Sequence, residues 1–135
     1  MGYAIFWGRN MNTNNVRSFV DEYILLCTQL CKKADDYTKE NVAKHNKAMK
    51  KLNVLRKEMY NDIQFAERVY KALLYHPEVY VQQSAATDCL RLNIHTNDSV
   101  KILKNICKQG DRMSSMSAKR TLLIWEGKLN PNDPF

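Results

Sequence analysis

Apolar side chains recur at three- and four-residue intervals along most of this chain, the spacing of one buried helix face. Phe19, Tyr23 and Cys27, for example, fall on one side of the first such segment. No stretch alternates apolar and polar residues at every second position, so no sheet is expected. The pattern predicts six helices, over about 14–34, 37–60, 62–75, 78–93, 98–109 and, starting at either Asp111 or Ser114, to about 125.

Polar capping residues and helix breakers separate these segments. Asn61-Asp62 precedes the third segment as a cap, and Asp35-Asp36 precedes the second. Pro77 breaks the chain between the third and fourth, and Gly110 is well placed to stop the fifth. Several less regular positions are also predicted to face inward: Val42, His45, Met49, Ile63, Met116 and Trp125.

The last four predicted helices contain an internal repeat. Shifting the chain by about 32 residues superposes two helix pairs, and an alanine falls in the middle of the second helix of each. Two-helix units that recur every 30 to 45 residues are typical of an α-solenoid, with an irregular bundle as the alternative. The matching positions are Leu74 with Ile106, Val81 with Met113, Ala86 with Ala118, and Leu90 with Leu122.

The stretch from Leu73 to Ala86 resembles a HEAT or armadillo repeat junction, because a helix end, a Pro-Glu turn and a paired alanine follow one another. With the segment 118–127 it is similar to a family of small bacterial HEAT-like domains, over about residues 60–127. The resemblance implies an all-α, HEAT/ARM-like α-solenoid of about six helices in three antiparallel pairs. It also implies an immunity protein, since members of such families lie beside polymorphic toxins and block one cognate toxin.

The length of 135 residues allows one domain with one core. We expect a flexible N-terminal extension at 1–13, a single helical domain at 14–127 and a tail at 128–135. No apolar run approaches membrane-spanning length, and no targeting segment is evident. The cysteines form no CxxC motif and are interpreted as core thiols in a reducing cytoplasm: Cys27, Cys31, Cys89 and Cys107.

The chain is basic, with a net charge of +7 from 21 Lys and Arg against 14 Asp and Glu. Much of this charge lies in the second predicted helix. Such a surface could bind phosphates, which makes a nucleic-acid-binding helical-repeat protein the alternative function; a solvated helix face is the simpler explanation. The candidate residues for an anionic partner are Lys44, Lys47, Lys50, Lys51 and Lys57.

No pattern of catalytic or metal-binding residues is present. His45, His76 and His95 stand apart from one another and outside any metal-ligand spacing. The adjacent acids Asp21-Glu22 would splay apart on a helix. We therefore expect no enzyme activity, no cofactor, no metal and no small-molecule substrate.

A cluster of aromatic and amide side chains surrounds the turn between the third and fourth predicted helices. Tyrosine is enriched at protein interfaces because it buries a large area. The cluster predicts a partner-binding surface, although packing within the domain would explain the tyrosines equally well. The candidate residues are Tyr75, Tyr80, Gln82 and Gln83.

Overall fold

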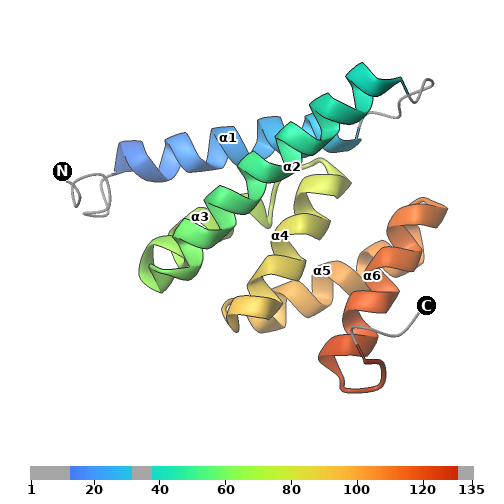
Figure 1. The fold of residues 1–135 in the computed structure, drawn as a ribbon. Coiled ribbons are helices and arrows are strands. Elements are labelled where there is room, and N and C mark those ends of the chain that lie inside the picture. The colour runs from blue at the N-terminus through green and yellow to red at the C-terminus, as the bar shows by residue number, and fades with distance from the viewer. Residues whose placement is uncertain (1–12, 32–37, 131–135) are drawn as a thin grey trace. The chain divides into compact units, whose positions relative to one another are not determined.

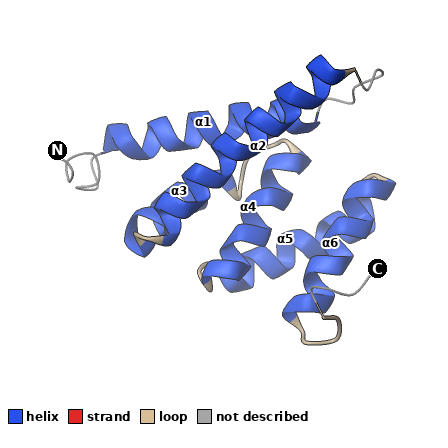
Figure 2. Cartoon of the chain, in the orientation of Figure 1, coloured by secondary structure: helices blue, strands red, loops and turns tan. Residues whose placement is uncertain are grey.

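The structure is a computed structural model that describes residues 13–31 and 38–130 (Figure 1). These residues form six α-helices and no strand (Figure 2). The predicted all-α, helical-repeat-like fold is therefore confirmed. The helices are α1 (Thr13–Cys31), α2 (Lys39–Tyr60), α3 (Ile63–Leu73), α4 (Val79–Leu92), α5 (Thr96–Gln109) and α6 (Arg112–Trp125).

The chain divides between Ala72 and Leu73 into two compact units. The first unit holds α1, α2 and nearly all of α3. Helix α1 packs against α2, and edge-to-face aromatic pairs join it to α3. The ring centroids of Phe19 and Phe65 are 4.8 Å apart, and those of Tyr23 and Tyr70 are 5.8 Å apart.

The buried face of α2 is narrower than predicted. It consists of Ala48, Leu52 and Met59. The predicted inward positions Val42, His45 and Met49 are exposed. Val42 and Met49 lie about 60° or more around the helix from the buried row, so three-and-four spacing alone placed them wrongly.

Side-chain caps define several helix starts. The Thr38 hydroxyl accepts from Asn41 N at 3.2 Å at the start of α2, whereas the predicted cap Asp35-Asp36 lies outside the described residues. Asp62 Oδ1 accepts from Phe65 N at 3.2 Å before α3, as predicted. Each of these bonds satisfies one of the N–H groups that a helix start leaves unpaired.

The second unit is built on α4, α5 and α6, each of which contacts the other two. In Figure 1, α4 and α6 run in the same general direction and α5 lies behind them. Short side chains allow helices to approach closely, and Ala85, Ala86 and Ala118 are fully buried here. The buried residues of the three helices include Val81, Ala85, Ala86, Cys89, Leu103, Ile106, Ala118 and Leu122.

The structure shifts the register of the repeat from about 32 residues to 33. Helices α4 and α6 are both 14 residues long and begin at Val79 and Arg112. The predicted match of Val81 with Met113 is wrong, because Val81 is buried and Met113 is 71% exposed. In the corrected register Ala85 matches Ala118, and both are buried.

The 33-residue spacing also relates the starts of α3 and α5, at Ile63 and Thr96. It is shorter than the roughly 40 to 47 residues of HEAT and armadillo units. The repeat-like character is thus confirmed, while membership of a HEAT-like family stays a prediction. Within the described residues, no helix combines the length and apolar character needed to cross a membrane.

Candidate functional site

The predicted cluster Tyr75, Tyr80, Gln82 and Gln83 divides into side chains held within the second unit and side chains on its surface. Gln82 is half-buried and donates from Nε2 to the Leu74 carbonyl oxygen at 3.4 Å. It therefore helps satisfy the C-terminal end of α3. Tyr80 and Gln83 are three residues apart on α4, where Tyr80 is 37% exposed and Gln83 is half-buried.

Tyr75 connects the segment before α4 to the start of α5. Its hydroxyl donates to Asp98 Oδ2 at 3.2 Å, and its ring is largely exposed. The hydrogen bond to Asp98, with the charge of the same carboxylate, raises the pKa of Tyr75. The hydroxyl is therefore a protonated donor at neutral pH, and the bond fixes the direction of an exposed ring.

The corrected register pairs Tyr80 and Gln83 of α4 with Met113 and Met116 of α6, each 33 residues further along. Met113 is 71% exposed and Met116 is 46% exposed. Since α4 and α6 contact each other and bury equivalent faces, these four side chains occupy equivalent outer positions of neighbouring helices. We call Tyr80, Gln83, Met113 and Met116 the α4–α6 surface.

The local sequence of α6 explains why its methionines point outward. Ser114, Ala118 and Leu122 recur every four residues and are buried. Met113 and Met116 lie about 140° and 160° around the helix from Ala118. The prediction that Met116 faces inward was wrong because this Ser-Ala-Leu row, with its polar first member, was not recognised as the buried face.

The lysines of α2 separate into two groups. Lys44, Lys47 and Lys51 share one side of the helix with Glu40, and Lys44 Nζ lies 3.6 Å from Glu40 Oε1. Both partners of this ion pair are exposed, so it contributes little to stability. Lys50 and Lys57 are exposed on the outer side of the helix, about 160° to 180° around it from the centre of the buried row.

Helix α2 concentrates the positive charge of the chain. It carries seven basic side chains against two acidic ones, which gives +5 of the total +7. No acidic side chain in the described part of the chain is within ion-pair distance of Lys47, Lys50, Lys51 or Lys57. These four lysines are therefore available to an acidic partner.

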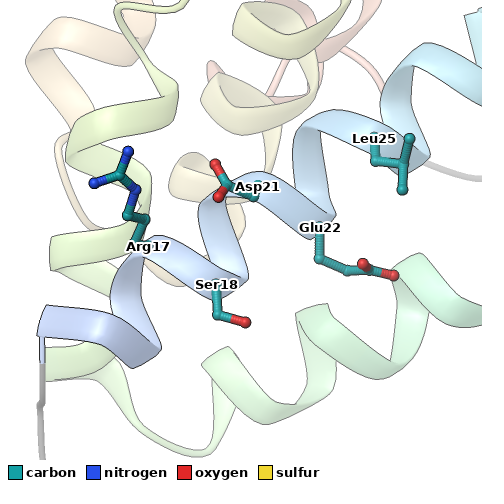
Figure 3. Close-up of a pocket in the computed structure, with 5 residues that line it drawn as sticks. All are labelled: Arg17, Ser18, Asp21, Glu22 and Leu25. Carbon is teal, nitrogen blue, oxygen red and sulfur yellow. The ribbon is translucent and has the colours of Figure 1, made fainter.

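A depression of about 420 Å³ lies on α1 and is lined by Arg17, Ser18, Asp21, Glu22 and Leu25 (Figure 3). All five belong to one helix. Figure 3 shows the carboxylates of Asp21 and Glu22 pointing in different directions, as their adjacency predicts. Polar groups do not converge here on a common point, which a catalytic site requires.

His76 and His95 have local structural roles near the starts of α4 and α5. His76 Nδ1 accepts from Glu78 N at 3.1 Å, so His76 caps the segment before α4. His95 is half-buried and adopts a left-handed backbone (φ 46°) at the start of α5. No group of His, Cys, Asp or Glu side chains able to hold a metal ion is found within residues 13–31 and 38–130.

Sequence reasoning missed the buried acid Asp88. Its side chain is almost fully buried, and Oδ1 lies 3.9 Å from Arg91 Nη1. The signal in the sequence was an Asp followed three residues later by an Arg, a spacing that places two oppositely charged side chains on the same face of a helix.

Comparisons of the chain with protein-family models, curated proteins and solved structures found no significant match. The two surfaces of this chain, on α4–α6 and on α2, are therefore the basis for assigning its function.

Proposed function

We propose that this protein is a protein-binding module that engages its partner through the α4–α6 surface. The observation that carries the proposal is the exposure of Tyr80 and Met113 at equivalent positions of two contacting helices, with Met116 exposed one turn after Met113. Following the family resemblance, we further propose that the partner is a toxin encoded beside this gene, and that the protein acts as its immunity protein.

The side chains of this surface suit protein recognition. Methionine is flexible and polarisable, so Met113 and Met116 can adapt to an irregular partner surface. Tyr80 adds aromatic area, and Gln83 adds hydrogen-bonding groups at the same face. Complete burial of one such apolar side chain stabilises a complex by roughly 1.5–3 kcal/mol.

The helical frame supports a steric mechanism. The backbones of α4 and α6 are held by the packing of both helices on α5 and by their contact with each other. A surface that is formed before binding loses little conformational entropy on association. The protein would block its partner by covering the active site or an essential surface.

The charge of the chain is compatible with this proposal. Inhibitors of nuclease toxins are commonly acidic, as the basic surfaces of nucleases require. Most of the positive charge here lies on α2, and the four members of the α4–α6 surface are uncharged. Arg112 and Lys119 of α6 are exposed about 40° and 60° around the helix from Met116, so a partner bound at α4–α6 would meet a mildly basic rim.

The test is co-expression of the tagged protein with the product of the adjacent gene, followed by purification and a cell-survival assay. We expect a one-to-one complex that protects the cells. The double variant Met113→Glu/Met116→Glu should lose at least about 30-fold in affinity, which corresponds to roughly 2 kcal/mol, and should lose protection. The matched control Asn105→Glu/Gln109→Glu adds the same two charges at exposed positions of α5 and should bind normally.

Unchanged binding by Met113→Glu/Met116→Glu would remove the α4–α6 surface from the proposal. Absence of any complex, together with no protection by the wild-type protein, would refute the immunity function. Circular dichroism of each variant separates loss of binding from loss of folding.

A further inference from the structure

The outer side of α2 carries a row of exposed apolar side chains. Val42, Met49 and Tyr60 are 44%, 37% and 67% exposed. They lie within about 20° of one another around the helix and extend over about 27 Å of its axis. Since α2 buries a different face, through Ala48, Leu52 and Met59, this row has no core to cover it.

A row of lysines runs beside the apolar row. Lys39, Lys50 and Lys57 are exposed and lie about 80° to 100° around the helix from Met49. The acidic residues of α2 are elsewhere, because Glu40 and Glu58 fall on the side that holds Lys44, Lys47 and Lys51. The outer side therefore combines an apolar row with a flanking lysine row free of acidic neighbours on the same helix.

We propose that the outer side of α2 binds an acidic amphipathic helix of another protein. The apolar stripe of that helix would pack on Val42, Met49 and Tyr60. Its flanking carboxylates would face Lys39, Lys50 and Lys57, as charged residues flank the apolar seam of a coiled coil. A contact length of about 27 Å corresponds to about 18 residues of partner helix. This site is distinct from the α4–α6 surface and does not depend on the function proposed for it.

The apolar row distinguishes a protein partner from a nucleic acid. A phosphate backbone would pair with the lysines but would leave Val42 and Met49 in water. Single-stranded nucleic acid would need stacking side chains, and Tyr60 is the aromatic member of this row.

The polar residues between the apolar ones distinguish a protein partner from a lipid bilayer. Asn46 and Asn53 fall close to the apolar row and are exposed. Amide groups can hydrogen-bond to a partner helix, whereas their burial among acyl chains would be costly. The row therefore fits a protein surface best.

The experiment titrates the full chain with three labelled probes and measures fluorescence anisotropy at 50 and 200 mM salt. The first probe is an 18-residue peptide with leucines at three-and-four spacing, one glutamate beside each leucine and alanines at the remaining positions, which favour the helix. The second is a glutamate peptide of equal charge without leucines. The third is a 20-nucleotide single-stranded DNA. We expect the leucine-glutamate peptide to bind at least tenfold more tightly than either other probe.

Two pairs of variants assign the contacts. Val42→Ser/Met49→Ser should weaken the leucine-glutamate peptide about five- to tenfold, while Val54→Ser, an exposed position on another side of α2, should not. Lys50→Gln/Lys57→Gln should weaken it by a similar factor. The matched control Lys47→Gln/Lys51→Gln removes the same charge from the same helix and should have a smaller effect.

Three results would overturn the proposal. Tighter binding of DNA that is unaffected by Val42→Ser/Met49→Ser would assign α2 to nucleic acid. Equal binding of both peptides would show that charge alone acts. Failure of all three probes to bind would show that the outer side is a solvated helix face.

Discussion

Replacement of Gly110 by alanine tests why the turn between α5 and α6 needs a glycine. Gly110 has φ −74° and ψ 169°, a conformation open to any residue, so it does not end α5 through a left-handed backbone. A Cβ atom at this position would lie 2.6 Å from the Ile106 carbonyl oxygen and 3.0 Å from Ile106 Cγ2. The glycine is required because there is no space for a side chain.

The neighbouring hydrogen bonds make this clash difficult to relieve. The Ile106 carbonyl accepts from Gly110 N at 2.8 Å and from the Ser115 hydroxyl at 3.1 Å. That hydroxyl is also 3.1 Å from the Gly110 carbonyl oxygen. A shift of about 0.4 Å or more would strain these contacts, and overpacking of this kind costs about 1–3 kcal/mol. The alanine recovers about 0.4–1 kcal/mol by restricting the unfolded chain. We expect Gly110→Ala to lower the free energy of unfolding by about 1–2 kcal/mol.

Urea unfolding followed by circular dichroism measures the effect as a change in midpoint at constant slope. The control is Gly127→Ala, since Gly127 has φ 75° and a Cβ atom added there would meet no other atom within 4 Å. Its cost should come from the left-handed backbone alone, about 1–2 kcal/mol, and Gly127→Asn should recover part of it. Crowding is refuted as the cause if Gly110→Ala is as stable as the wild-type protein, or if a larger residue at position 110 costs no more than alanine.

Three further predictions concern the second unit. Burial raises the pKa of the Cys89 thiol to about 12. In a variant that keeps only this cysteine, alkylation at pH 8 should be about 10³-fold slower in the folded than in the unfolded protein. Comparable alkylation rates would contradict the burial of the thiol. Because folding favours the protonated thiol, its contribution to stability should fall as pH rises from about 9 toward 12, and Cys89→Ala should remove that part of the pH dependence. Asp111 Oδ1 accepts from Ser114 N at 2.8 Å, so Asp111→Ala should cost about 1 kcal/mol in urea unfolding, with Asp111→Asn as the cap-preserving control. Ala118 is fully buried, so Ala118→Leu should cost about 1–3 kcal/mol or more while Met116→Leu, on the exposed side of the same helix, should be nearly neutral.

The helices could be predicted from the sequence because local signals agree with the fold. Three-and-four spacing identified all six helices, and Asp62 caps α3 through Phe65 N as its position suggested. The predicted starts of α3 and α6 are close to the observed ones because Asp62 and Asp111 each cap a backbone N–H three residues further along. Such short-range interactions can be read without knowing which helices meet.

The faces of the helices were harder to predict because burial depends on neighbours that are distant in sequence. Leu26 and Phe65 are buried although neither was assigned to the core, while Ile63 and Trp125 are exposed although both were. Periodicity gives the direction of an apolar side chain around its own helix. It does not show which arc of that helix another helix covers.

The register of the repeat was the decisive error for the candidate site. An alignment by residue type preferred Ala86 with Ala118, whereas the structure matches Ala85 with Ala118. One residue corresponds to about 100° around a helix. That rotation moved Met113 from a supposed core position to the outer position equivalent to Tyr80. The α4–α6 surface could not be recognised until this rotation was corrected.

The two proposed surfaces differ in chemistry, and this difference gives a final prediction. The members of the α4–α6 surface are uncharged, but Arg112 and Lys119 of α6 are exposed beside Met116. A complex formed there should therefore depend less on ionic strength than one formed at α2. The outer side of α2 is flanked by exposed lysines, and screening reduces such interactions once the Debye length falls from about 14 Å at 50 mM to about 7 Å at 200 mM salt. Binding at α2 should therefore weaken several-fold over this range, and Lys50→Gln/Lys57→Gln should flatten the dependence. A salt-sensitive complex that tolerates changes at α2 but not at Met113 and Met116 would contradict this division, because the attraction would then have to come from charges around α4 and α6.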